Sequence, residues 1–164
     1  MFKHFHLSSL LAAMIFLAFS SCQAPEAYRK AAIAFSQGSE IEMRDRFEDL
    51  SGNTPEGMTL INNIYDAPPA DTARTADQYY QEAMKALGTA LKGENQLKKL
   101  DVLDNALAIK ALTEWRQGNY DAAKATAEQA LPLLEKDNSG ENDFRDLAMM
   151  QALPGLINID LAFN

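Results

Sequence analysis

The stretch that decides the fold is residues 107–131, LAIKALTEWRQGNYDAAKATAEQAL. Leu107, Ala111 and Trp115 recur at intervals of four residues and therefore share one face of a helix. Gly118 follows, and glycine enters the left-handed helix-ending conformation without steric cost. Small and apolar side chains then recur at helical spacing, at Tyr120, Ala123, Ala127, Ala130 and Leu131. The stretch predicts two antiparallel helices joined by a tight turn, with small side chains that allow close packing.

Helical spacing also marks most of the remaining chain. Apolar stripes predict helices over residues 26–37, 41–50, 75–91 and 94–117, one that ends near Lys136, and a last helical region from residue 142. Gly38 and Gly93 are expected to end helices, because glycine destabilises a helix interior. Thr75 and Gln78 form a capping-box pattern. Pro154 is expected to bend or break the last helix.

The N-terminus has the pattern of a secretory signal. Residues 1–9 are short and basic, and residues 10–19 form an apolar run too short to span a bilayer, which needs roughly 20 residues. The end of this run, Phe19-Ser20-Ser21-Cys22, resembles the lipobox of bacterial lipoproteins. The resemblance implies that residues 1–21 are removed, that Cys22 carries the lipid, and that residues 22–25 are a short tether to one helical domain over residues 26–164.

Removal of this signal would limit the chemistry of the protein. Both histidines, His4 and His6, lie in it, and the only cysteine would be acylated. The rest of the chain then lacks the side chains for Ser-His-Asp triads, Cys-His nucleophiles and common zinc sites. Asp101 and Asp104 are too few ligands for a hard cation. We therefore expect no catalysis, no cofactor and no metal site.

The charge balance argues against nucleic acid as a partner. The chain has 15 Lys and Arg residues against 23 Asp and Glu residues, a net charge of −8. Loss of Lys3 with the signal would make the remaining chain still more acidic. Such a surface repels phosphate backbones and is compatible with a soluble domain held at a membrane by lipid alone.

An internal repeat extends the prediction from one hairpin to a stack. Four pairs of residues match at a constant offset of 40 positions: Tyr80 and Tyr120, Ala83 and Ala123, Ala90 and Ala130, Leu91 and Leu131. The residues Leu107, Ala111, Gly118, Tyr120, Ala123, Ala127 and Ala130 fall at the spacing of a tetratricopeptide repeat, which this unit resembles. The resemblance implies an all-α stack of antiparallel helical hairpins that binds proteins or peptides and has no catalytic residues. Its concave face would carry Asn105, Ala108, Leu112, Trp115 and Arg116.

Three features leave alternatives open. Trp115 is either an anchor in a ligand groove or a core residue that closes the hairpin over Tyr120. Tyr79 and Tyr80 point in different directions from a helix, so we expect at most one of them in the core. The apolar residues 156–163 either pack back on the core or belong to a chain that continues beyond Asn164.

These observations favour a non-catalytic, lipid-anchored interaction scaffold on the periplasmic face of a bacterial envelope. Gln23 after the cysteine favours the outer membrane over the inner one. The expected partners are another envelope protein or peptide and, through the anchor, the membrane. The alternative is a small-solute-binding helical lipoprotein that works with a transporter, with a pocket lined by Trp115 and the tyrosines. The number of repeats and the oligomeric state stay open.

Overall fold

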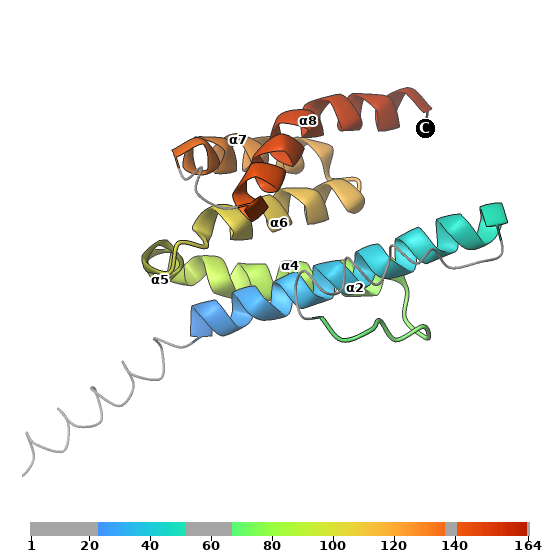
Figure 1. The fold of residues 1–164 in the computed structure, drawn as a ribbon, viewed down its shortest axis with the longest axis horizontal. Helices are drawn as coiled ribbons and strands as arrows, with labels where there is room; N and C mark the ends of the chain where they lie inside the picture. The colour runs from blue at the N-terminus through green and yellow to red at the C-terminus, as the bar shows by residue number, and fades with distance from the viewer. Residues whose placement is uncertain (1–22, 52–66, 137–140, 164) are drawn as a thin grey trace, which may run out of the picture.

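The structure, a computed structural model, describes residues 23–51, 67–136 and 141–163. Within these ranges all regular secondary structure is helical and there is no strand, which confirms the all-α class, while residues 67–75 form an irregular segment before α4 (Figure 1). The signal over residues 1–21 and the lipid site at Cys22 lie outside the described residues. The elements are α2 (Gln23–Ser51), α4 (Ala76–Ala90), the 3-10 helix η1 (Leu91–Gly93), α5 (Glu94–Lys99), α6 (Leu103–Arg116), α7 (Tyr120–Lys136) and α8 (Glu141–Phe163).

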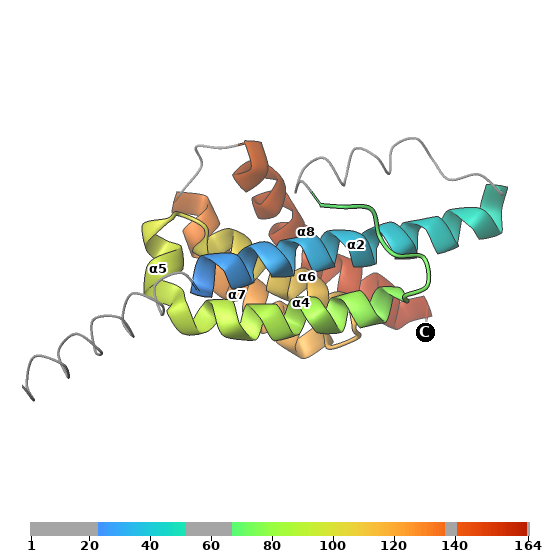
Figure 2. The same cartoon turned by 90° about the horizontal axis from the view of Figure 1, so that it is seen from below.

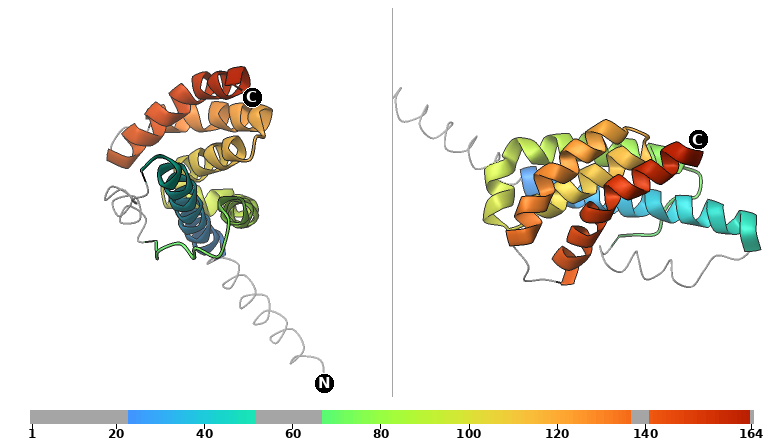
Figure 3. Two further views of the ribbon diagram at one scale, coloured as in Figure 1. Left: turned by 90° about the vertical axis from the view of Figure 1, so that its right-hand side faces the viewer. Right: turned by 90° about the horizontal axis from the view of Figure 1, so that it is seen from above.

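The helices pack as neighbours in chain order. Helices α2 and α4 run antiparallel along one side of the molecule, and α6 and α7 run antiparallel above them (Figures 1 and 2). Helix α6 also contacts α2 and α4, and α8 packs on α7 and α6 (Figure 3). Helix α6 is therefore the central element, and α8 is the outermost. None of the helices in the described part of the chain is both long enough and apolar enough to cross a membrane.

A seam of small residues lets α2 lie close to α4. Ala24, Ala27, Ala31 and Ala34 recur at intervals of three and four residues and are all buried. Gly38 continues this seam, and a Cβ atom at Gly38 would lie 2.7 Å from Cε1 of the Tyr80 ring. The expectation that Gly38 ends a helix is therefore wrong. Helix α2 runs through it without a break, because the missing side chain makes room for α4.

The start of α2 also differs from the expected tether. Residues 23–25 form the first turn of the helix, and Ala24 is buried. Pro25 is tolerated there because the first backbone N–H groups of a helix have no acceptor within it. Gly93 lies opposite this turn, and a Cβ atom on it would collide with the Cβ atom of Ala24. Residues 23–25 thus belong to the packed helix α2.

The capping box and the central hairpin are confirmed. The hydroxyl of Thr75 accepts a hydrogen bond from the backbone N–H of Gln78, whose side chain bonds back to Thr75. Gly118 has a φ of +74° at the end of α6. Its N–H donates to the carbonyl of Trp115, and the next N–H, of Asn119, donates to Glu114, each at 2.9 Å. This pair of bonds is the glycine-dependent helix end that the spacing predicts.

The predicted helix over residues 94–117 is divided into α5 and α6. The backbone turns at Asp101, which has a φ of +56°, and the N–H of Val102 donates to the carbonyl of Leu97 at 3.1 Å. Aspartate tolerates this left-handed conformation better than most residues do. The sequence pattern shows no glycine or proline here, so the break was not predicted.

The last helix continues past Pro154 to Phe163 and changes direction along its length (Figure 3). Met150, Leu153 and Ile157 are fully buried against the rest of the molecule. By contrast, Ile159 is 54% exposed and Phe163 is 87% exposed. The apolar ending therefore packs back on the core only in part.

A polar cluster joins α6 to α7 within this core. Glu114 is 5% exposed and accepts hydrogen bonds from Lys110 and, at 2.6 Å, from the hydroxyl of Thr126. The Lys110 ammonium also donates to that hydroxyl at 2.8 Å. Each polar group of the cluster thus has a partner, as burial requires.

Candidate functional site

The end of α6 meets α8 through the only tryptophan of the chain. Trp115 is 9% exposed, and its indole Nε1–H donates to Oδ2 of Asp160 at 2.6 Å. A buried indole N–H needs an acceptor, and α8 supplies one. The bond holds the ring in one orientation and confirms the core alternative for Trp115, whose outer edge still reaches the surface.

Arg116 connects the end of α6 to α2. Its guanidinium lies 4.2 Å from the centre of the Trp115 ring, and its Nη1 donates to Oε1 of Glu42 at 3.1 Å. Arg46 donates to the same oxygen at 2.8 Å, and the Tyr80 hydroxyl donates to the other oxygen at 2.7 Å. Glu42 therefore accepts three hydrogen bonds, which connect α2, α4 and α6.

The Tyr80 hydroxyl keeps its proton at any physiological pH. Burial raises the pKa of this hydroxyl, and the hydrogen bond to the Glu42 carboxylate raises it further. Tyr80 is thus a permanent donor in the network. The network holds side chains of α2, α4 and α6 in place.

A cavity of about 380 Å³ lies where α2, α6 and α8 meet. We call it the junction cavity, and it is lined by Glu42, Arg46, Trp115, Arg116, Gly118, Tyr120, Asp160 and Phe163. Its carboxylates already accept hydrogen bonds, whereas its arginines and aromatic rings offer planar surfaces to a ligand. Such a set can bind side chains of another molecule by stacking and charge. The described residues hold no group of three or more metal-ligating side chains.

The five predicted groove residues do not form one open groove. Trp115 and Arg116 both line the junction cavity. Asn105 instead donates to Oδ2 of Asp146 on α8 at 3.1 Å. Ala108 is 1% exposed, and Leu112 is half-buried against the core. Helix α8 is the reason, because it packs on the face of α6 that carries these residues.

The prediction that at most one of Tyr79 and Tyr80 is in the core is wrong, since both are almost fully buried. Tyr80 packs over Gly38 of α2. The Tyr79 hydroxyl accepts a hydrogen bond from the backbone N–H of Asp71 at 2.7 Å, and Arg74 stacks on its ring at 3.9 Å. The irregular segment before α4, which contains Asp71 and Arg74, thus covers the Tyr79 ring. Neither tyrosine lines the junction cavity beside Trp115.

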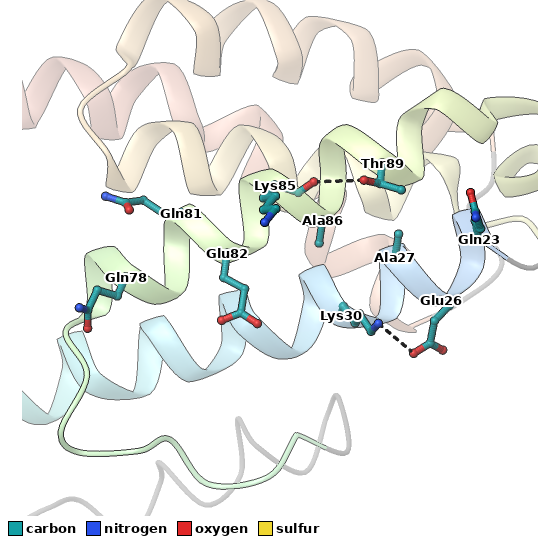
Figure 4. A pocket seen from close by; sticks show the side chains of 10 residues that line it. All are labelled: Gln23, Glu26, Ala27, Lys30, Gln78, Gln81, Glu82, Lys85, Ala86 and Thr89. Atoms are coloured by element: carbon teal, nitrogen blue, oxygen red, sulfur yellow. Dashed lines mark hydrogen bonds and ion pairs between the residues drawn. The ribbon is translucent and has the colours of Figure 1, made fainter.

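A second, larger groove of about 830 Å³ runs along α2 and α4 (Figure 4). Ala27 and Ala86 form its apolar floor, and glutamine, lysine and glutamate side chains surround it. Lys30 and Glu26 pair across 3.9 Å, but both side chains are more than half exposed. The groove contains no aromatic ring and no buried polar group that would fix a ligand, so it is the weaker candidate.

Sequence reasoning missed several members of the junction cavity. Glu42 and Arg46 line the cavity, although nothing in the sequence pattern of residues 41–50 singled them out. Sequence reasoning also did not single out Asp160 as a partner for Trp115. The charge at residue 160 inside an apolar run was the one available signal, since an acid in such a run needs a donor.

No protein-family model matches the chain, and a search of curated proteins and of solved structures gives no match.

Proposed function

We propose that this protein is a non-catalytic interaction scaffold, held by a lipid on Cys22 at the periplasmic face of a bacterial envelope. It binds a partner protein or peptide at the junction cavity. The observation that carries the proposal is the group of arginine and aromatic side chains around that cavity, of which Arg46, Arg116 and Phe163 are exposed. Arginine, tryptophan and tyrosine are the residues most enriched at energetically important points of protein interfaces.

The contacts inside the cavity also favour binding. Asp160 holds Trp115, and Glu42 holds Arg116, before any ligand arrives. Side chains that are already ordered lose less conformational entropy on binding. Arg46, with a side chain 70% exposed, and Phe163 remain at the rim to contact a partner.

For the fold we propose a stack of tetratricopeptide-like hairpins, with α2 and α4 as one pair, α6 and α7 as the next, and α8 as the first helix of a third. Matched burial supports this. Ala83 and Ala123 are each 0% exposed, and so are Ala90 and Ala130, at the same offset of 40 positions. Equivalent positions with equivalent burial are what a structural repeat requires.

The proposed anchor and the cavity lie at different parts of α2. The helix begins at Gln23, next to the proposed lipid site, and reaches Glu42 after 19 residues. At 1.5 Å per residue this is about 28 Å along the helix axis. The scaffold would therefore present its partner site away from the lipid surface. Release of the protein from membranes by Cys22→Ser would test the anchor by itself.

Site-specific photocrosslinking in intact cells tests the partner site. A photoreactive phenylalanine analogue replaces Tyr120, which lines the cavity, and in a matched control it replaces Glu128, which is exposed farther along α7. We expect one protein adduct from position 120, none from position 128, and loss of the adduct with Arg116→Glu. Equal adducts from both positions, or none from position 120, would contradict the proposal.

The small-solute alternative keeps one supporting observation. The cavity beside Trp115 measures about 380 Å³, which is within the range of small-ligand sites. Because Trp115 is the only tryptophan, its fluorescence reports on this cavity alone. A saturable change with a metabolite, together with no adduct at position 120, would favour solute binding over a protein partner.

A further inference from the structure

Helix α8 has one unpartnered apolar face. Each of α2, α4, α6 and α7 lies in a hairpin with a neighbour, whereas α8 packs on α7 and α6 and has no hairpin partner within the described residues. Its core-facing side uses Met150, Leu153 and Ile157. A second row of apolar side chains follows the same helix at intervals of three and four residues: Met149, Ala152, Leu156, Ile159 and Phe163.

We call this second row the α8 stripe. Met149 and Leu156 are half-buried at the edge of the core, while Ala152, Ile159 and Phe163 are exposed. Alternation of three and four residues is the spacing by which one helix packs along another. The stripe therefore has the form of one half of a two-helix contact.

The stripe is complementary to itself when two copies run antiparallel. If Ala152 of one copy lies opposite Leu156 of the other, then Met149 lies opposite Ile159, and Arg145 lies opposite Phe163. This register pairs a small side chain with a large one in its central layers. It also pairs a flexible thioether with a branched side chain, which a methionine accommodates easily.

The charges agree with the same register. The stripe itself carries no charge, so two copies of a chain with a net charge of −8 can meet there without direct repulsion. The last turn of α8 contains no basic residue, and its carbonyl groups carry partial negative charge. The register brings Arg145 of the other copy, a cation, to that turn.

Arg145 can stack on a ring without losing its present contact. Its side chain is 39% exposed, and its Nε lies 3.7 Å from Oδ1 of Asp146. A guanidinium keeps such an in-plane contact while its face covers an aromatic ring. Arg116 shows this arrangement in the same molecule, where it stacks on Trp115 and donates to Glu42.

From these observations we propose that the α8 stripe binds a second copy of this chain in a symmetric, antiparallel dimer. The stripe covers 14 residue steps, about 21 Å of helix. A contact of one helix pair is at the small end of specific interfaces, below about 1,200 Å², where association is weak and reversible. The dimer is expected to be weak, and because Phe163 belongs both to the stripe and to the junction cavity, it would compete for that side chain with the partner proposed for the cavity.

Sedimentation of the full chain across a roughly hundredfold range of concentration tests the dimer. The mass is expected to rise from one copy to two, and Ile159→Glu is expected to weaken the association at least tenfold. Leu161→Glu is the matched control, because Leu161 is 56% exposed, Ile159 is 54% exposed, and both lie on α8. Leu161 is off the stripe, so its variant should dimerise as the unchanged chain does. Residues 1–22 are identical in both variants and cannot cause a difference between them.

A mixed crosslink tests the register. In a Cys22→Ser background, chains with Ala152→Cys are mixed with chains that carry Leu156→Cys, and we expect a disulfide mainly between unlike chains. A single mass at all concentrations, or equal behaviour of Ile159→Glu and Leu161→Glu, would overturn the proposal. In that case, binding of the stripe to phospholipid vesicles, if observed, would assign it to a lipid surface.

Discussion

The close approach of α2 and α4 at Gly38 makes a prediction whose sign is unusual. Replacing a glycine inside a helix by alanine normally stabilises a protein by about 0.5–1 kcal/mol, because the unfolded chain loses freedom. At Gly38 the added Cβ would lie 2.7 Å and 2.9 Å from two carbons of the Tyr80 ring and 3.2 Å from the carbonyl oxygen of Ala76. We therefore expect Gly38→Ala to destabilise the protein.

The free-energy cost of Gly38→Ala depends on whether the Tyr80 ring can move away from the added Cβ atom. The Tyr80 side chain is 3% exposed, and its hydroxyl is bound to Glu42, so the ring cannot turn away without breaking that bond. Overpacking of a tight core costs about 1–3 kcal/mol. After subtraction of the helical gain, Gly38→Ala should cost about 1–2 kcal/mol, a fall of a few degrees in the thermal midpoint.

Gly88 in α4 provides the control, since a Cβ atom there would meet nothing within 4 Å. Urea unfolding followed by circular dichroism should show Gly88→Ala stabilised and Gly38→Ala destabilised. In a Tyr80→Ala background, Gly38→Ala should lose most of its cost. Stabilisation by both alanines would refute the close packing of α2 on α4. A cost at Gly38 that persists without the ring would indicate a helix break there instead.

Three further predictions concern the core. Trp115→Ala should cost roughly 3–5 kcal/mol in urea unfolding, and an unchanged midpoint would contradict its core position. Thr126→Val should cost about 1–3 kcal/mol, because it removes a donor from the buried Glu114 carboxylate, whereas Thr126→Ser should be close to neutral. Burial raises the pKa of Tyr80 above its usual 10.0, so the folded chain keeps a proton that the unfolded chain loses at high pH. That contribution is complete below pH 10.0 and falls above it by about 1.4 kcal/mol per pH unit. A titration of unfolding free energy against pH should show this slope in the unchanged chain and lack it in Tyr80→Phe; identical slopes would argue against burial of the hydroxyl.

The sequence by itself determined several of the helix ends. The Thr75 capping box, the turn at Gly118 and the end of α7 at Lys136 all agree with the structure. Each depends on hydrogen bonds and side-chain contacts between residues no more than about five positions apart. Information of this range is present in the local order of residues, so periodicity and capping patterns are enough to recover it.

Only the tertiary structure decided which residues of different helices contact one another. Gly38 looks the same in sequence whether it ends a helix or admits a neighbouring ring, and the ring of Tyr80 that decides between these lies 42 positions away. The candidate site has the same origin, because Arg116 reaches Glu42 across 74 positions and Trp115 reaches Asp160 across 45. Such pairs form when helices dock, and docking depends on the summed shape of whole faces rather than on any local pattern.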